Sequence, residues 1–227
     1  MQHILLLTTE RWSLIINHRS ERWSLLEVSF MPKGFTLTSE QLTERRLDIM
    51  KVALNLFQVK GVEKTSMREI ADLAGLGKSS LYDFFQSKDD IVIYAIEAQV
   101  NNAVTTVQKI INANLTPDQT LKEIMKINLS YSKENNILFM WLATKAYFLD
   151  EDHQERIKKV RHTYQNIVQS VIEQGIKDGL FRVTDSELAS RLLINSMLSI
   201  TYTSHPSHSM EEMLNEAVNI FLHGITS

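Results

Sequence analysis

The 227-residue sequence has no cysteine, only three prolines and only seven glycines. Without cysteine there is no disulfide framework and no thiolate chemistry, which fits a reducing cytoplasm. No apolar run approaches the roughly 20 residues needed to span a bilayer, so no membrane partner is expected. The scarcity of proline, glycine and alternating β-branched runs favours an all-α fold. The hydrophobic content of 44% is enough for a sizeable core in one large or two small domains.

Signatures of catalysis are also missing. The sequence has no Gly-x-Gly-x-x-Gly after a strand, no Walker-type phosphate loop and no His-Glu-x-x-His. Of the seven histidines, only His205 and His208 have a plausible ligand spacing, and their Pro-Ser loop gives them neither a shared helix nor a third ligand. We therefore expect no enzymatic activity, no metal site and no cofactor.

The most informative stretch begins at Ser66. Ser66 and Glu69, three residues later, form a capping box that starts a short helix. Gly75 follows where the chain must reverse, because glycine enters the left-handed region without steric cost. The apolar pattern resumes at Leu81 and Phe84 in a second helix, which packs only if it crosses the first steeply. This pattern predicts a helix-turn-helix, whose second helix lies in the DNA major groove.

Both flanks of the motif continue as helices. Upstream, an apolar helix face ends at Lys60-Gly61, which is typical of a helix C-terminus. Downstream, Ser87 is the expected N-cap of another helix, whose first turn carries Asp89 and Asp90 where the helix dipole favours negative charge.

The segment from about Thr43 to Asp90 resembles the DNA-binding domain of the TetR family of bacterial regulators. The resemblance implies an N-terminal three-helix DNA-binding domain followed by a C-terminal helical ligand-binding and dimerisation domain. Gly77, Ser79-Ser80 and Asp83 depart from the family pattern, which affects the bases read and leaves the fold unchanged. The shared positions are Phe57-x-x-x-Gly61, Thr65-Ser66-x-Arg68-x-Ile70-Ala71, Ala74-Gly75, Leu81-Tyr82-x-x-Phe85 and Ser87-Lys88.

The candidate contacts to double-stranded DNA lie on the motif and at the start of the following helix. The first turn of the second helix reaches base edges, and an arginine on the helix before it can reach a guanine. A phenol and an ammonium group suit phosphate oxygens, as the resemblance also implies. A buried role for the tyrosine and a capping role for the serines are the alternatives. The candidates are Arg68, Lys78, Ser79 and Ser80 for bases, Tyr82 and Lys88 for phosphates, and Thr65 and Ser66 from the family motif.

The charge of the chain offers no general attraction to a polyanion. The net charge is −3, and between residues 43 and 92 eight basic residues stand against eight acidic ones. DNA binding must therefore depend on charge placement, with Lys64, Arg68, Lys78 and Lys88 near one face. The same balance supports an alternative function, an all-helical adaptor for protein–protein interaction with a vestigial helix-turn-helix.

The remainder of the chain reads as helices separated by clear boundaries. Residues 137–149 are apolar nearly all round, which predicts a fully buried helix. The other expected boundaries are the Asn114-Leu115 break, the Thr116-Pro-Asp-Gln119 cap, the Asn135-Asn136 turn, the long helix from Asp150 to Asp178-Gly179, and caps at Thr184 with Glu187 and Ser209 with Glu212.

The last two helices carry apolar residues on more than one face, among them Leu188, Leu192 and Leu198. A second apolar face indicates a subunit interface. In the TetR family these helices form a four-helix bundle with a partner, so the resemblance implies a homodimer. Two recognition helices about one DNA turn apart, roughly 34 to 36 Å, predict a palindromic operator.

Aromatic residues and methionines in the middle helices form the candidate lining of a pocket for a small apolar effector. Such residues are more often plain core, and none of them is an acid or base that would anchor a ligand. A bound effector would shift the connecting helix and release a repressor from DNA. The candidates are Met125, Leu129, Met140, Trp141, Tyr147, Phe148, Tyr164, Ile167 and Met197.

The first thirty residues differ from the rest. Glu10-Arg-Trp-Ser-Leu14 recurs as Glu21-Arg-Trp-Ser-Leu25, with no further copies. Either this segment is a family-atypical arm, or Met31 is the true start, which we favour because the motif needs only a short polar lead. A native peptide containing Trp12 or Trp23 would exclude the Met31 start. The expected units are residues 1–30, a DNA-binding domain over 31–90 and a ligand-binding and dimerisation domain over 91–227.

Overall fold

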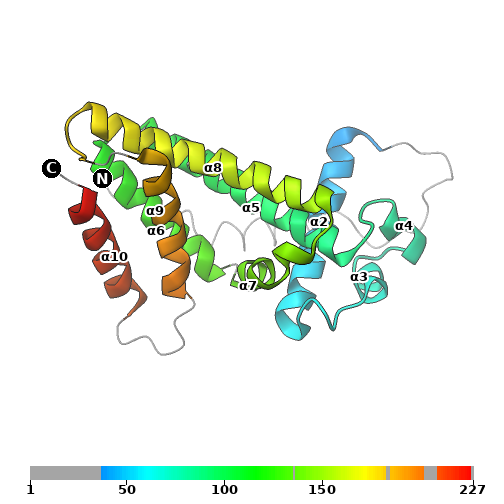
Figure 1. Cartoon of the computed structure of the whole chain (residues 1–227). Coiled ribbons are helices and arrows are strands. Elements are labelled where there is room, and N and C mark those ends of the chain that lie inside the picture. Colours follow the sequence, from blue (N-terminus) through cyan, green and yellow to red (C-terminus); the bar gives the residue numbers. More distant parts are fainter. Residues whose placement is uncertain (1–36, 135, 183–184, 202–208, 226–227) are drawn as a thin grey trace.

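The structure, a computed structural model, describes residues 37–134, 136–182, 185–201 and 209–225. These residues form helices joined by short turns, which confirms the all-α class (Figure 1). The repeated N-terminal segment, His205 and His208 lie outside the described residues. No described helix is both long enough and apolar enough to cross a membrane.

Three helices make up the N-terminal module: α2 (Ser39–Lys60), α3 (Met67–Leu73) and α4 (Lys78–Tyr82). The first begins earlier than expected from the apolar pattern, because Thr38 and Gln41 form a capping box of their own. It ends at Gly61, whose φ of 82° lies in the left-handed region that favours glycine.

The predicted helix-turn-helix is confirmed in its details. The Ser66 hydroxyl accepts a hydrogen bond from the Glu69 amide, and the Glu69 carboxylate accepts one from the Ser66 amide at 2.9 Å. Gly75 turns the chain with a φ of 65°. Ile70 of α3 and Leu81 of α4 are both buried in the same core cluster, so the two helices of the motif pack through their apolar sides.

The C-terminal part is organised around two long helices, α5 (Lys88–Ile111) and α8 (Glu151–Lys177), which run alongside each other (Figure 1). The helices α6, α9 and α10 gather at the end far from the motif, whereas the short α7 lies nearer to it. Their bounds are α6 Pro117–Glu134, α7 Asn136–Lys145, a 3₁₀ turn η1 Ala146–Phe148, α9 Ser186–Thr201 and α10 Met210–Ile225.

The helix starts follow the predicted caps with one correction. Ser87 caps α5 by accepting from the Asp90 amide, and Ser209 with Glu212 forms the capping box of α10. Helix α9 is capped by Asp185, whose carboxylate accepts from the Leu188 amide at 2.8 Å. The cap therefore lies one residue after the expected Thr184, because α9 begins at Ser186 and the Asp185 carboxylate accepts from the amide three residues further on.

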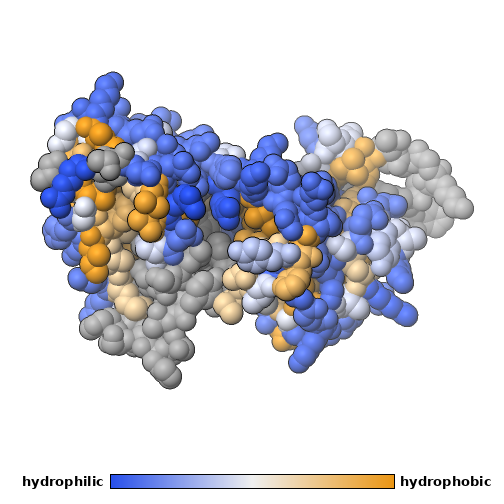
Figure 2. All heavy atoms as spheres, viewed as in Figure 1, coloured by the Kyte–Doolittle hydropathy of each residue, from blue (hydrophilic) through white to orange (hydrophobic). Residues whose placement is uncertain are grey.

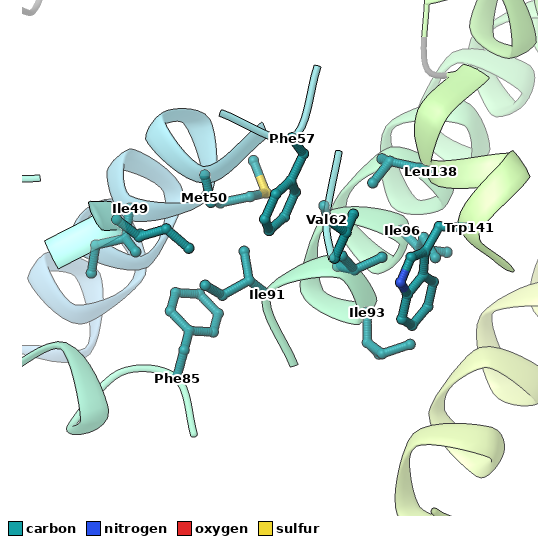
Figure 3. Packing of buried hydrophobic residues seen from close by; sticks show 14 of the residues in the cluster. Ile49, Met50, Phe57, Val62, Phe85, Ile91, Ile93, Ile96, Leu138 and Trp141 are labelled. Atoms are coloured by element: carbon teal, nitrogen blue, oxygen red, sulfur yellow. The ribbon is translucent and has the colours of Figure 1, made fainter. Parts of the chain in front are cut away.

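The core consists of two clusters that share α5. The first joins the three N-terminal helices to the start of α5 and to Leu138 and Trp141 of α7 (Figure 3). The second fills the space between α5, α6, α8, α9 and α10. Val100 of α5 packs against both clusters. The N-terminal module therefore shares one continuous core with the C-terminal part.

The expectation that residues 137–149 are fully buried is wrong. Leu138 and Trp141 are buried, but Met140 is 47% exposed, Tyr147 91% and Phe148 84%. The reason is that α7 contacts α5 and α6 and joins the first core cluster through Leu138 and Trp141, while Met140 is left at the surface. The α-helix also gives way to a 3₁₀ turn at Ala146, which carries the two aromatic side chains into solvent.

Candidate nucleic-acid interface

The second helix of the motif presents a polar face to solvent. Leu81 is fully buried and fixes α4 against the core, while Lys78 and Ser79 are exposed on the opposite side. Ser80 and Tyr82 are partly exposed. Gly77 stands at the N-cap and supplies no side-chain cap. Three of the four predicted base-reading residues, Lys78, Ser79 and Ser80, thus lie on the first turn of α4, and the fourth, Arg68, lies on α3.

The first helix of the motif contributes one free cation and two side chains that act internally. Arg68 is 81% exposed and only loosely paired, with its Nε 3.9 Å from the Asp72 carboxylate. The Ser66 hydroxyl is engaged with Glu69. Thr65 is buried, and its hydroxyl donates to the Gly61 carbonyl at 2.9 Å. Thr65 and Ser66 therefore shape the entry to α3.

Lys88 also has a structural role. Its Nζ donates to the carbonyls of Val62 at 2.7 Å and Glu63 at 3.0 Å, in the loop between α2 and α3. The start of α5 thereby holds the start of the motif in place. The predicted phosphate contact by this ammonium would have to be made in addition to these two bonds.

Two arginines that the sequence did not single out fix α2 to the motif. Arg45 donates to the carbonyl of Ala74 at 3.0 Å, at the turn between α3 and α4. The Arg46 guanidinium lies over the rings of Phe85 and Tyr94, 4.7 and 4.5 Å from their centres. These partners lie far from α2 in sequence, so no local pattern could have indicated them.

The charges near the motif are placed more favourably for binding DNA phosphates than their count suggests. Glu63 of the module lies 2.8 Å from Lys145, and Asp90 in the first turn of α5, which the charge count over residues 43–92 includes, lies 2.8 Å from Arg156. Two of the eight counted acids are therefore paired with cations outside that range. The ammonium of Lys145 lowers the pKa of Glu63.

A third acid is neutralised within the module. Lys60 donates to the Glu69 carboxylate, and with the Ser66 contacts this lowers the pKa of Glu69 to about 2. Lys64, Arg68 and Lys78 remain as exposed cations around the motif. These three cations stand beside two exposed acids of the motif, Asp72 and Asp83, so the pairing of Glu63 and Glu69 with lysines reduces the negative charge that a phosphate backbone would meet.

The nine predicted pocket residues are not brought into one enclosed lining. Met125, Leu129 and Tyr164 are buried and Ile167 is partly buried in the C-terminal part, whereas Trp141 belongs to the first cluster. Met140, Tyr147 and Phe148 are exposed, as described above, and the side chain of Met197 lies outside the described part.

One polar group inside the C-terminal part was missed. Tyr164 donates its phenol proton to the Oδ1 of Asn128 on α6, whose Nδ2 is buried without a partner in the described chain. A single asparagine on a helix gives no sequence signal of this kind.

Two hollows open on the described surface, at other places than the predicted pocket. The first, of about 440 Å³, lies where the end of α8 meets α10, and the second, of about 240 Å³, lies between α8 and α9. None of the nine predicted residues lines either hollow. The first is lined by Asp118, Gly179, Leu180, Phe181, Asn219, Leu222 and His223, and the second by Arg161, His162, Gln165, Glu187, Arg191, Ile194 and Asn195.

Comparison with known families decides the identity of the fold. Residues 49–95 match the family described as bacterial regulatory proteins, tetR family, and residues 114–225 match the tetracyclin repressor-like C-terminal domain. The chain belongs to the TetR family. As a TetR-family member it is a DNA-binding transcriptional regulator and not an enzyme.

Individual relatives agree with this TetR assignment over most of the chain. The HTH-type transcriptional repressor KstR2 of Rhodococcus jostii is 24% identical over 187 residues, covering 81% of this chain and 92% of the relative. A TetR/AcrR-family regulator from Thermobifida fusca superimposes with a TM-score of 0.68 at 25% identity, over 80% of this chain and 98% of that one. The Bacillus subtilis regulator FadR, solved in complex with stearoyl-CoA, also gives 0.68, at 17% identity over 79% and 98% of the chains.

Proposed function

We propose that the protein is a homodimeric repressor that binds a palindromic operator and is released by a small apolar molecule bound in its C-terminal part. The observation that carries the proposal is the arrangement around α4. Lys64, Arg68 and Lys78 are exposed there, while the neighbouring acids Glu63 and Glu69 are paired with lysines. Phosphates on either side of a major groove would meet cations and few free carboxylates.

The dimer follows from apolar side chains that one chain leaves in solvent on its last two helices. Leu188 is 49% exposed and Leu192 57% on α9, and Ile220 is 66% exposed on α10. Figure 2 shows hydrophobic atoms at the surface over this end of the molecule. Pairing these helices with the same helices of a second copy would remove them from water. The two copies of α4 would then read half-sites related by a twofold axis.

The release step is proposed from the way the two core clusters meet. Helix α5 carries residues of both clusters and begins next to the motif. A molecule that separates α6 or α8 from α5 would therefore tilt the recognition helices α4 of the two copies. Release requires that the molecule prefer the form with the wrong spacing. The apolar cluster around Tyr164 and the Asn128–Tyr164 pair suit a molecule with a long apolar body and one polar end, provided that the helices separate to admit it.

The test is selection of bound sequences from random duplex DNA by the purified full chain. We expect enrichment of a palindrome with half-sites about one helical turn apart and a steep salt dependence of the dissociation constant. Stearoyl-CoA is then added to the complex, with free coenzyme A as the control for its nucleotide part. The proposal fails if no duplex is enriched at moderate salt while light scattering shows a monomer.

The adaptor alternative drew its support from the neutral charge of the N-terminal module. The pairing of Glu63 and Asp90 with cations outside that module weakens this support. An adaptor would show the same weak binding to all duplexes, falling away at moderate salt without a preferred sequence.

A further inference from the structure

The loop over residues 61–66 sets the position of the first helix of the motif. Within the loop, the Thr65 hydroxyl closes the turn on the Gly61 carbonyl, and Ser66 provides the N-cap of α3. A displacement of this loop would therefore move α3 and, through their packed contact, the recognition helix α4.

Two residues of this loop are held by α7, a helix of the C-terminal part. Val62 is 6% exposed and belongs to the same core cluster as Leu138 and Trp141 of α7, and all three are labelled in Figure 3. The next residue, Glu63, pairs with Lys145 at the last position of α7. The C-terminal part thus pairs ionically with the start of the motif and shares an apolar core cluster with it.

The Glu63–Lys145 pair is exposed to solvent, and the burial of Trp141 leaves its indole donor without a hydrogen bond in the described part of the chain. The side chains of Glu63 and Lys145 are 71% and 43% exposed, so their pairing guides orientation and adds little stability. Trp141 is nearly buried, and its indole Nε1 has no acceptor in the described part of the chain. Undocking of α7 would give this donor a water partner, which offsets part of the lost apolar contact. The contact is therefore suited to breaking and reforming.

Helix α7 also has room and a connection that would let it move. On its outer side Met140 is half exposed, and its end loosens into the 3₁₀ turn at Ala146. At its other end it follows α6, which carries Met125 and Asn128 of the C-terminal part. A change in the packing of α6 would therefore reach α7 directly.

We propose that α7 is a lever on the DNA-binding motif, with Lys145 and Trp141 as positioning residues for operator binding. In the docked state they hold loop 61–66 and α3 in the orientation that reads DNA. An effector that draws α7 away frees the loop and weakens binding, by a route additional to the shift of α5. This inference rests on the proposed function, since it assigns the path of regulation.

The first experiment is a charge swap across the contact. Lys145→Glu should lower the affinity for the selected operator by about fivefold or more, because two carboxylates then face each other at the loop. The double variant Lys145→Glu with Glu63→Lys has the wild-type net charge and should return to within about twofold of wild type. The matched control is Lys126→Glu, which disrupts the pair with Glu123 on α6 at a lysine as exposed as Lys145, 42% against 43%, and should leave affinity unchanged. Equal affinity of Lys145→Glu and wild type, or no recovery in the double variant, overturns the inference.

The second experiment reads the contact itself. In a Trp12→Phe, Trp23→Phe background the only tryptophan is Trp141, so its emission reports the docking of α7. Lys145→Glu should shift this emission to longer wavelength, and operator binding should shift it to shorter wavelength. If neither shift is seen, the proposal that α7 positions the motif is overturned, even if DNA binding is normal. Failure of the wild-type chain to bind any duplex would instead overturn the proposed function. If the emission of Trp141 still responds to Lys145→Glu in that case, the contact of α7 exists and only the DNA-binding role is wrong.

Discussion

Glu69 makes more contacts than any other acid of the motif. Its carboxylate accepts from the Ser66 amide, the Ser66 hydroxyl and the Lys60 ammonium, which together lower its pKa to about 2. Because the folded pKa lies below the unfolded one, the stability contributed by the ionised group is present above about pH 4.5 and is lost as the pH falls through about 2. Glu69→Gln should therefore show a smaller fall in its urea midpoint between these pH values than wild type does. The exposed Glu216→Gln on α10 is the control and should follow wild type.

Lys78 is exposed at the start of the recognition helix, so its removal should affect DNA binding and leave the fold intact. Because Lys78 is a candidate base contact, Lys78→Ala should weaken the selected operator more than unrelated duplexes, and the loss of one cation from the interface should reduce the slope of log affinity against log salt by up to about 0.9. Fluorescence anisotropy over a salt series measures the slope, and thermal unfolding checks the fold. Lys109→Ala, an exposed lysine near the end of α5, should leave the slope unchanged. An unaltered slope in Lys78→Ala would remove this residue from the interface.

Features that depend on residues close together in the sequence could be predicted, whereas contacts between distant residues could not. The capping boxes at Ser66 and Ser209 and the left-handed turn at Gly75 were predictable because each depends on residues within a few positions. The contacts of Lys145 with Glu63 and of Lys88 with the same loop were not, because they join helices whose relative placement only the tertiary fold determines. Composition marked the pocket candidates as apolar, yet it could not tell the buried Trp141 from the exposed Met140 next to it in α7.

At the scale of elements, a single arginine ties together the two long helices. Arg156 on α8 donates to both oxygens of Glu97 at 2.9 and 2.8 Å and to Asp90 at 2.8 Å, all on α5 or its first turn. These two carboxylates raise the pKa of Arg156 further above its ordinary value. All three side chains are largely shielded from solvent. The position of α8 therefore determines how the first turn of α5 lies beside the motif.

Removing this guanidinium should cost more than breaking a surface pair. Arg156→Met leaves two shielded carboxylates facing each other and should lower the free energy of unfolding by about 2 kcal/mol. Arg156→Lys retains the charge without the bidentate geometry, so its free energy of unfolding should lie between those of wild type and Arg156→Met. Urea denaturation at neutral pH measures the difference. Lys158→Met, which breaks the exposed pair with Glu155, should change stability by less than about 0.5 kcal/mol. Equal losses in Arg156→Met and Lys158→Met would show that α5 and α8 are held by apolar packing alone.

At the scale of the whole molecule, the proposed dimer depends on the last two helices. Leu192→Asp places a carboxylate on the α9 face that a second copy would cover, and a charge buried without a partner is expensive. We expect the dissociation constant of the dimer to rise by at least about a hundredfold, which corresponds to roughly 3 kcal/mol. Sedimentation velocity over a concentration series measures this change.

Operator affinity should fall with the dimer in Leu192→Asp, although no DNA-contacting residue changes, because each monomer then binds one half-site without help from the other. Tyr147→Asp is the control, since it adds the same charge at a side chain that is 91% exposed outside the last two helices. It should leave both assembly and the spacing of the selected half-sites unchanged. If Leu192→Asp stays dimeric while Tyr147→Asp dissociates, the subunit interface lies at the α7–α8 corner, and the two recognition helices would be held apart by a different distance.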